Sequence, residues 1–122
     1  CFRMNMNEIA TAVRHNIPVI EVVVNNHVLG MVRQWQDLFY DERYSATVLR
    51  DKVDFVKLAE AMGAEGIRAE SQDEFRDAFA KALTLNRPVV IDCQIDSDDK
   101  VWPMVAPGAA ISDAFDEEDM GK

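Results

Sequence analysis

Two adjacent asparagines follow an apolar segment that has the composition of a buried strand. The segment 18–24 is rich in β-branched residues, and Asn25 and Asn26 come directly after it. An amide side chain in such a position offers a neutral oxygen to a hard cation, beside turn carbonyls such as that of Val28, and Mg²⁺ commonly links such groups to phosphates. Asparagine also ends strands and forms turns. The spacing alone therefore leaves a metal site and a simple turn as alternatives.

Other residue types that often do chemistry carry weaker signals. His15 and His27 have no Asp or Cys at the spacing of a nucleophilic site, so we interpret them as surface histidines. Cys1 and Cys93 lack the spacing of metal ligands, which favours a reducing compartment. Because Cys93 lies in an apolar segment, it is expected to be a small buried residue rather than a reactive thiol.

The charge of the chain is concentrated at one end. The 122 residues carry a net charge of −9, and nine acidic residues with only two lysines lie between Asp92 and Lys122. The acidic stretches 96–99 and 113–119 lack the glycine and spacing of a calcium loop, so we expect a solvated tail. The excess of acid argues against a nucleic-acid partner. The apolar runs are too short to span a bilayer, which argues against a membrane protein.

The elements that must position these residues alternate between helix and strand. The predicted order is a helix capped by Asn5 or Asn7, a strand over 18–24, a loop from Asn25 into a short helix, a helix after Asp54, a short strand at 67–69, a helix after Ser71 and a strand over 88–95. This alternation predicts an α/β fold, an open parallel sheet in three layers with helices on both faces. Ligands of such sheets bind beyond the carboxyl ends of the strands, which directs attention to Asn25 and Asn26.

Local signals support several of these boundaries. Asp54 can cap the helix that follows it, and Gly63 stands where a left-handed residue ends a helix. Ser71 with Glu74 three residues later forms a capping box. The nearly continuous apolar character of segment 18–24 predicts a strand that is buried on both faces.

The motifs resemble those of a known enzyme family. The residues from Asn25 to Tyr40 read NNHVLGMVRQWQDLFY, and they resemble the C-terminal thiamine-diphosphate-binding domain of the acetolactate synthase (acetohydroxyacid synthase) catalytic subunit. The resemblance continues through FRMNMNEIA at 2–10, DFVKLAEAMG at 54–63 and WPMVAPG at 102–108. In this family the diphosphate motif opens with Gly-Asp-Gly and closes with Asn-Asn. Because no Gly-Asp-Gly precedes Asn25 here, we expect a fragment truncated at its N-terminal side.

The resemblance also implies which residues form the cofactor site. Mg²⁺ would be bound by the side chain of Asn26 and the carbonyl of Val28, with the third ligand, the motif Asp, outside this chain. The implied cofactor-binding residues are Asn26, His27, Val28, Leu29, Gly30 and Met31, together with Cys1. Trp35 and Met31 would contact the substrate, although large apolar residues are also ordinary core contacts. No catalytic side chain is implied here, because the activating glutamate lies in another domain.

The implied function is that of a thiamine-diphosphate-dependent transferase. It would decarboxylate pyruvate and condense the product with pyruvate or 2-oxobutyrate in branched-chain amino-acid biosynthesis. The family implies a cytoplasmic homo-oligomer, a dimer or tetramer, with a regulatory small subunit as a further partner and FAD on a middle domain. Residues 1–96 would be the C-terminal part of the cofactor-binding domain and residues 97–122 an irregular acidic tail.

Two alternatives to this function stay open. The chain could derive from another thiamine-diphosphate enzyme, namely a catabolic acetolactate synthase, a pyruvate oxidase or a glyoxylate carboligase. It could also be a non-catalytic α/β interaction module. Under the main hypothesis, the isolated fragment is expected to be inactive.

Overall fold

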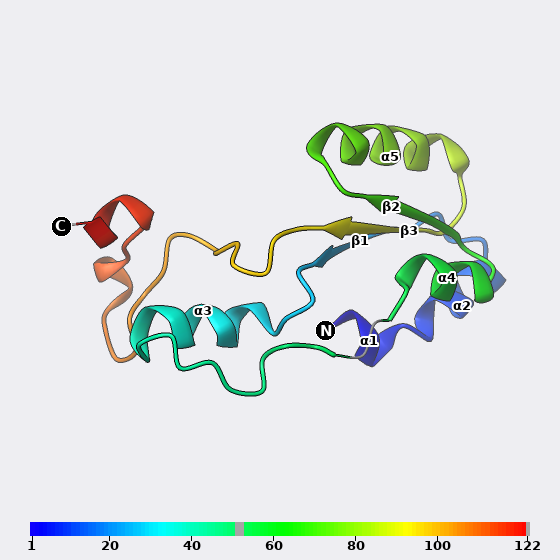
Figure 1. Ribbon diagram of the computed structural model, residues 1–122. Coiled ribbons are helices and arrows are strands. Elements are labelled where there is room, and N and C mark those ends of the chain that lie inside the picture. Colours follow the sequence, from blue (N-terminus) through cyan, green and yellow to red (C-terminus); the bar gives the residue numbers. More distant parts are fainter. Residues whose placement is uncertain (51–52, 122) are drawn as a thin grey trace. The chain divides into compact units, whose positions relative to one another are not determined.

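The computed structural model describes residues 1–50 and 53–121 (Figure 1). Its elements are α1 (Phe2–Asn5), α2 (Glu8–Arg14), β1 (Ile20–Asn25), α3 (Gly30–Phe39), α4 (Phe55–Ala61), β2 (Glu65–Ala69), α5 (Gln72–Leu85), β3 (Val89–Gln94) and two 3₁₀ turns, η1 (Ile111–Asp113) and η2 (Glu117–Gly121). They form two compact units. The sheet unit comprises Cys1–Asn26 and Arg50–Ile95, and the α3 unit comprises His27–Leu49 and Asp96–Lys122. No helix among the described residues has the length and apolar character needed to cross a membrane.

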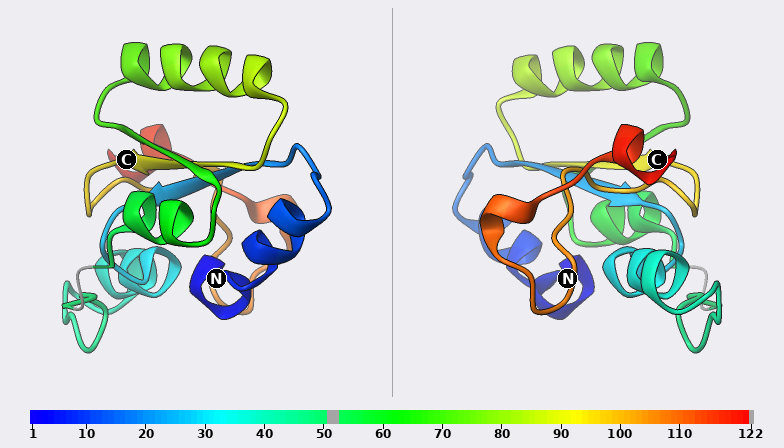
Figure 2. Two further views of the ribbon diagram at one scale, coloured as in Figure 1. Left: turned by 90° about the vertical axis from the view of Figure 1, so that its right-hand side faces the viewer. Right: turned by 90° about the vertical axis from the view of Figure 1, so that its left-hand side faces the viewer.

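Three parallel strands form the sheet of the sheet unit, in the order β1–β3–β2. In the central strand, Ile91 lies opposite Val22 of β1 and Ile67 of β2. Because β3 has a strand on each side and helices above and below, its first four residues are buried. Figure 2 shows α5 on one face of the sheet and α1, α2 and α4 on the other. The predicted α/β fold with helices on both faces is confirmed.

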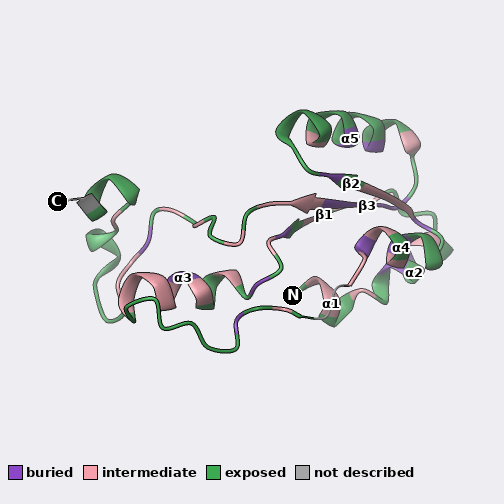
Figure 3. Cartoon of the chain, viewed as in Figure 1, coloured by how far each residue is buried: buried purple, intermediate pink, exposed green. Residues whose placement is uncertain are grey.

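Side chains of β3 alternate between two apolar cores. Val89 and Ile91 pack against α5 through Ala78 and Ala82. Val90 points to the opposite face and packs against α2 and α4. Figure 3 shows the buried residues of this unit along β3 and on the sides of the helices that face it. Each face of the central strand therefore has its own helical layer.

β1 is more exposed than segment 18–24 predicts. Among the described residues it pairs with β3, and α5 packs over β2 and β3. Val22 and Val24 consequently keep 38% and 63% of their surface exposed. The prediction of a strand buried on both faces is wrong for β1, because β-branched composition indicates a strand without indicating its place in the sheet.

The N-caps predicted for α4 and α5 are present in the structure. The carboxylate of Asp54 caps α4 by accepting a hydrogen bond from a first-turn N–H at 3.2 Å. Ser71 caps α5 by accepting from the N–H of Glu74, also at 3.2 Å. The Glu74 carboxylate accepts from the N–H of Glu70 at 2.7 Å, one residue before the position that a capping box uses. Gly63 has a φ of +87°, the left-handed conformation expected after α4.

The predicted cap of the first helix is wrong. Asn7 occupies the N-cap position of α2, but its side chain makes no capping hydrogen bond and instead lies 3.3 Å from the Glu8 carboxylate. α1 runs almost directly into α2, and Met6 and Asn7 both keep helical backbone angles. Asn7 therefore lacks the extended conformation that aims a capping side chain at the first turn. The end of this helix before Pro18 is as predicted.

The α3 unit joins α3 to the C-terminal segment. Met104 is buried and forms an antiparallel bridge with Phe115, with main-chain hydrogen bonds of 2.7 and 2.8 Å. The rings of Phe39 and Trp102 meet Phe115 edge-on, with centroids 6.3 and 5.9 Å away. The expectation of an irregular, solvated tail is thus only partly correct, because its acidic residues are exposed while Trp102, Met104 and Phe115 pack. The predicted domain division after residue 96 stays a prediction.

Candidate functional site

Asn25 and Asn26 have different surroundings in the structure. Asn25 is buried at the carboxyl end of β1, and its amide donates a 2.9 Å hydrogen bond to the carboxylate of Asp92 on β3. Its carbonyl accepts a hydrogen bond from the N–H of Ile95 at 3.1 Å. Asn25 is thus built into the sheet. Asn26 is the residue at which the chain leaves the strand, and its role as a metal ligand stays a prediction.

The chain after Asn26 is braced by main-chain hydrogen bonds. His27 has a left-handed φ of +57°, and its carbonyl accepts from the N–H of Leu49 at 2.9 Å. The N–H of Leu29 donates to the carbonyl of Thr47 at 2.8 Å. The segment predicted to line a diphosphate is therefore a turn held on both sides by main-chain contacts.

α3 begins directly after this turn and has no side-chain cap. Val28 is buried in an antiparallel bridge with Val48, and Leu29 occupies the N-cap position without a side-chain hydrogen bond. The N–H groups of the first turn, which starts at Gly30, have no acceptor within the helix itself. Such a helix start carries a partial positive charge and favours anions. The turn and helix start therefore offer main-chain groups to an anionic ligand.

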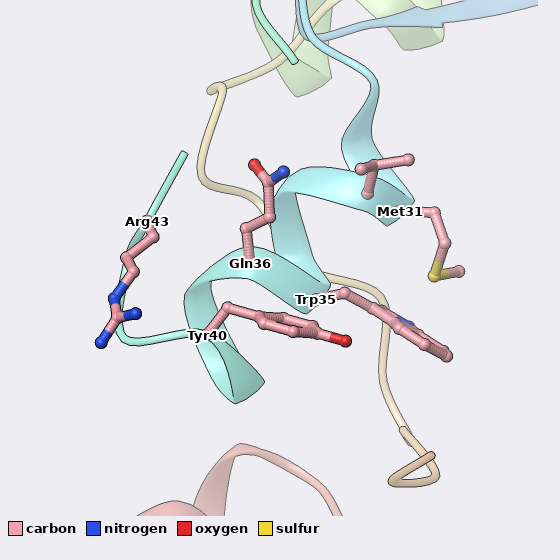
Figure 4. Close-up of a pocket in the computed structure, with 6 residues that line it drawn as sticks. Met31, Trp35, Gln36, Tyr40 and Arg43 are labelled. Carbon is pink, nitrogen blue, oxygen red and sulfur yellow. The ribbon is translucent and has the colours of Figure 1, made fainter. Parts of the chain in front are cut away.

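A cavity of about 390 Å³ lies along α3 and the chain that follows it (Figure 4). Its lining residues are Met31, Val32, Trp35, Gln36, Tyr40 and Arg43. Because residues four apart share one side of a helix, α3 brings Met31 and Trp35 to the same wall. In Figure 4, Trp35 lies between the Met31 side chain and the ring of Tyr40. The structure thus brings together the two residues predicted to contact substrate, and that role itself stays a prediction.

Trp35 is the largest side chain in this wall. Its ring meets Phe39 edge-on, with centroids 5.9 Å apart. Its indole nitrogen is buried and has no hydrogen-bond partner in the part of the chain that the structure describes. Since buried donors normally have a partner, the wall retains unused hydrogen-bonding capacity at Trp35.

Long-range polar contacts hold α3 to the C-terminal segment, and sequence reasoning missed them. The buried amide of Gln34 donates to the carbonyl of Val101 and accepts from its N–H, both at 2.9 Å. Arg33 donates to Asp98 at 2.6 and 2.7 Å, and its guanidinium lies 4.0 Å from the centroid of the Tyr44 ring. These partners of Gln34 and Arg33 are 67 and 65 residues away in the chain. No local pattern could have revealed them.

A second part of this network centres on Asp37. Its carboxylate accepts from Lys100 Nζ at 2.8 Å and from the Tyr44 hydroxyl at 2.7 Å. The hydrogen bonds from Lys100 and then from Tyr44 lower the pKa of Asp37, and the hydrogen bond to Asp37 raises the pKa of Lys100. The hydrogen bond to Asp37 also raises the pKa of Tyr44 to about 12. At neutral pH the cluster is thus an ion pair beside a protonated phenol, which suits structural support rather than acid–base catalysis.

The predicted site residues fall in both units. Cys1, which is exposed at the start of the four-residue α1, and Asn26 belong to the sheet unit. Residues 27–31 and Trp35 belong to the α3 unit. Sequence reasoning did not single out Asp92, although an acidic residue inside an apolar strand is a signal that could have found it.

Sequence comparison finds relatives among the acetolactate synthases. The chain is 45% identical to an acetolactate synthase of Mycobacterium leprae (strain TN), over 99% of this chain and 22% of that protein. It is 46% identical to the acetolactate synthase large subunit of Corynebacterium glutamicum, over 93% of this chain and 19% of that protein. It is 40% identical to the acetolactate synthase isozyme 2 large subunit of Escherichia coli (strain K12), over 95% of this chain and 21% of that protein. The chain spans about a fifth of the length of these curated relatives.

Solved structures share the fold. A benzoylformate decarboxylase from Polynucleobacter necessarius matches 83% of this chain and 19% of its own, with a TM-score of 0.73 and 28% identity. A thiamine diphosphate-dependent 4-hydroxybenzoylformate decarboxylase of Rhodococcus jostii RHA1 matches 78% of this chain and 18% of its own, with a TM-score of 0.70 and 24% identity. Residues 1–93 match the family described as thiamine pyrophosphate enzyme, C-terminal TPP binding domain. The chain therefore belongs to this family of thiamine-diphosphate-binding domains.

Proposed function

We propose that the chain is the cofactor-binding C-terminal part of a biosynthetic acetolactate synthase. The full enzyme would decarboxylate pyruvate and join the remaining two-carbon unit to a second pyruvate or to 2-oxobutyrate. Family membership and the acetolactate synthase relatives support this class of enzyme. One structural observation carries the proposal. The hydrogen-bonded turn at His27, the uncapped start of α3 and the cavity wall of Met31 and Trp35 follow one another directly along the chain.

The residues present fit thiamine diphosphate and Mg²⁺. The Asn26 amide oxygen and the Val28 carbonyl are neutral, hard donors, which suit an ion whose charge a diphosphate balances. The first turn of α3, which no side chain caps, offers N–H groups to phosphate oxygens. Asn26 and Val28 would therefore hold the ion, while the main chain of residues 27–30 would lie against the diphosphate. Cys1 at the start of α1 is a further proposed contact.

The chain's own side chains would shape the space around the reacting groups. When bound, thiamine diphosphate supplies the nucleophilic carbon that adds to the 2-oxo acid and takes up the electron pair released with carbon dioxide. The Met31 thioether would pack beside the cofactor rings. Trp35 would form the apolar wall against the acceptor, where the extra methylene of 2-oxobutyrate gains about 0.8 kcal/mol of burial relative to pyruvate. This wall therefore favours 2-oxobutyrate as acceptor.

The remaining parts of the proposed enzyme lie outside this chain. They are the third metal ligand, the glutamate that activates the cofactor and the FAD-binding domain. We place the full protein in the cytoplasm as a homo-oligomer, a dimer or tetramer, that binds a regulatory small subunit. The resemblance to acetolactate synthases supports these assignments. The isolated 122-residue chain should then show no activity and little heat on titration with Mg²⁺ and thiamine diphosphate. Micromolar binding would contradict the proposal that part of the metal site lies outside this chain.

A competition assay on the full-length protein tests the proposal. With pyruvate and 2-oxobutyrate together, the biosynthetic enzyme should use 2-oxobutyrate preferentially as acceptor. Trp35→Leu should reduce this preference, because the apolar wall becomes smaller. Trp102→Leu removes the same side-chain type from the same unit but outside the cavity lining, and it should keep the preference.

The alternatives predict other outcomes of this assay. Condensation of pyruvate alone, with 2-oxobutyrate rejected, would replace the biosynthetic assignment by the catabolic acetolactate synthase. Oxidation of pyruvate or condensation of glyoxylate would identify a pyruvate oxidase or a glyoxylate carboligase. A full-length protein that binds no thiamine diphosphate would support a non-catalytic module.

A further inference from the structure

A row of polar side chains crosses the sheet near the carboxyl ends of its three strands. Asn25 of β1 donates to Asp92 Oδ1 of β3 at 2.9 Å. Arg68 of β2 lies 3.5 Å from Asp92 Oδ2 and 3.1 Å from the carboxylate of Asp54, which caps α4. The side-chain amide of Gln94 also donates to Asp92 Oδ1, at 2.8 Å. Asp92 therefore connects all three strands and the start of α4.

Burying the carboxylate of Asp92 costs free energy that a purely structural role does not require. It is 1% exposed and follows three fully buried apolar residues in the central strand. A buried carboxylate must recover the cost of leaving water through its partners, and an apolar side chain of similar size often gives equal or greater stability. The cationic partner, Arg68, is itself 43% exposed at its side chain. Stability alone is therefore a weak reason for an acid at this position.

The hydrogen bond from Asn25 is what links Asp92 to the proposed site. Asn25 is held at two points, by its side chain on Asp92 and by its carbonyl on the N–H of Ile95. The next residue is Asn26, to which the proposed function gives a side-chain bond to the metal. Any rotation of the backbone at Asn25 would move the Asn26 oxygen, so the anchor on Asp92 sets where that oxygen can lie.

We propose that Asp92 is a positioning residue for the cofactor's metal ion, acting through Asn25 on the metal ligand Asn26. This inference rests on the proposed function, because it takes Asn26 as a ligand. Residues that orient metal ligands from outside the coordination sphere typically change metal affinity about 10- to 100-fold when they are removed. Asp92 therefore acts on the affinity for Mg²⁺ and thiamine diphosphate and does not contact the reacting atoms.

The test compares variants of the full-length protein by two measurements. The first is the Mg²⁺ concentration that half-saturates thiamine diphosphate binding, measured by calorimetry without substrate. The second is the melting temperature of the cofactor-free protein. Asp92→Leu and Asn25→Ala should each raise the half-saturating Mg²⁺ concentration roughly tenfold or more. The double variant should be no worse than the weaker-binding single variant, because both remove the same link.

Two further variants separate positioning from loss of stability. Asp92→Asn keeps an oxygen that accepts from Asn25, so it should recover most of the affinity lost in Asp92→Leu. Ile91→Ala removes a buried side chain from the same strand on the opposite face, so it should lower the melting temperature without changing the Mg²⁺ requirement. If Asp92→Leu does not fold, the Asn25→Ala variant with the Ile91→Ala control carries the test.

The failures of this inference and of the proposed function are distinguishable. The inference is overturned if the Mg²⁺ requirement of Asp92→Leu, or of Asn25→Ala where that variant carries the test, moves no more than that of Ile91→Ala. It is also overturned if the effects of Asp92→Leu and Asn25→Ala multiply in the double variant. If instead Asn26→Ala leaves the Mg²⁺ requirement unchanged, the proposed metal site itself is wrong.

Discussion

Helices α4 and α5 of the sheet unit begin in a different way from α3, whereas α1 and α2 also lack a side-chain cap. In the sheet unit, α4 and α5 start on the side chains of Asp54 and Ser71, which occupy main-chain N–H groups of the first turn. In the α3 unit, α3 starts on Leu29, whose side chain caps nothing. A helix that only supports a fold gains from such a cap, typically about 1 kcal/mol. The open start of α3 fits a helix whose first turn is reserved for an anionic ligand.

Different kinds of interaction stabilise the interior of each unit. The sheet unit is built on Val89, Val90 and Ile91, which are almost fully buried between helices. The α3 unit combines aromatic packing around Phe115 with polar contacts of Gln34 and Asp37 to the C-terminal segment. Apolar burial is insensitive to salt and pH, whereas the partly exposed Asp37–Lys100 ion pair is weakened by screening. The sheet unit should therefore be the more robust of the two.

The largest effect should come from the core of the sheet unit. Ile91→Ala leaves a cavity in the central strand and should lower the free energy of unfolding by about 3 kcal/mol. Ile111→Ala removes the same side chain from an exposed position in the α3 unit and should change it by less than about 0.5 kcal/mol. Urea denaturation of the full-length variants measures both. Equal losses would mean that the comparison between the units is wrong.

The next effect distinguishes two glutamines of α3 that make the same kind of contact. Gln34 pairs with both main-chain groups of Val101 and is buried, whereas Gln36 pairs with both main-chain groups of Ser45 in a more exposed place. Gln34→Ala removes two hydrogen bonds made by a buried side chain and should cost about 2 kcal/mol. Gln36→Ala should cost less, because water replaces the lost partners. A thermal melt in which Gln36→Ala is the less stable variant would contradict this ranking.

Removing the cap of α5 and introducing one at α3 should have smaller and opposite effects on stability. Ser71→Ala should destabilise the protein by about 1 kcal/mol, because α5 loses its cap. Leu29→Asp should stabilise the cofactor-free protein by a similar amount, about 1 kcal/mol, because it caps α3 and adds negative charge there. The same change should weaken thiamine diphosphate binding, since the carboxylate competes with the diphosphate. Calorimetric titration and melting of the Leu29→Asp protein check both signs, and unchanged cofactor affinity would argue against an anion site at α3.

The smallest effect concerns the hydrogen bonds around Asp37. Because the folded pKa of Tyr44 is raised to about 12, its contribution to stability is fully present below its ordinary pKa of 10.0. This contribution is lost as the pH rises through about 12. Asp37→Asn should bring the Tyr44 pKa back toward its ordinary value. Phenolate absorbance, taken as the difference from Tyr44→Phe, measures it, and ionisation of Tyr44 near its ordinary pKa in the unaltered protein would show that the hydrogen bond to Asp37 is absent.

Local structure could be predicted wherever neighbouring residues decide it. The caps at Asp54 and Ser71 and the left-handed Gly63 depend on residues a few positions apart, so their signals are visible in the sequence. Met31 and Trp35 meet in one cavity because helical spacing places them on one side. The prediction failed at Asn7, where the preceding turn of helix determines the backbone.

Features that depend on strand order or on distant partners could not be predicted. The exposure of Val24 follows from the position of β1 beside β3 in the sheet, which the β-branched pattern does not encode. The hydrogen bond from Asn25 to Asp92 joins residues 67 positions apart, as does that from Gln34 to Val101. Such contacts arise only after the chain has folded, so a single sequence carries no periodic signal for them.

The most direct test of the account is the binding of thiamine diphosphate to the full-length Asn26→Ala protein in the presence of Mg²⁺. Asn7→Ala serves as the matched control, because Asn7 lies in the same unit and its side chain caps no helix. We expect Asn26→Ala to weaken cofactor binding roughly tenfold or more and Asn7→Ala to leave it unchanged. Unchanged affinity in Asn26→Ala would contradict the proposed cofactor site.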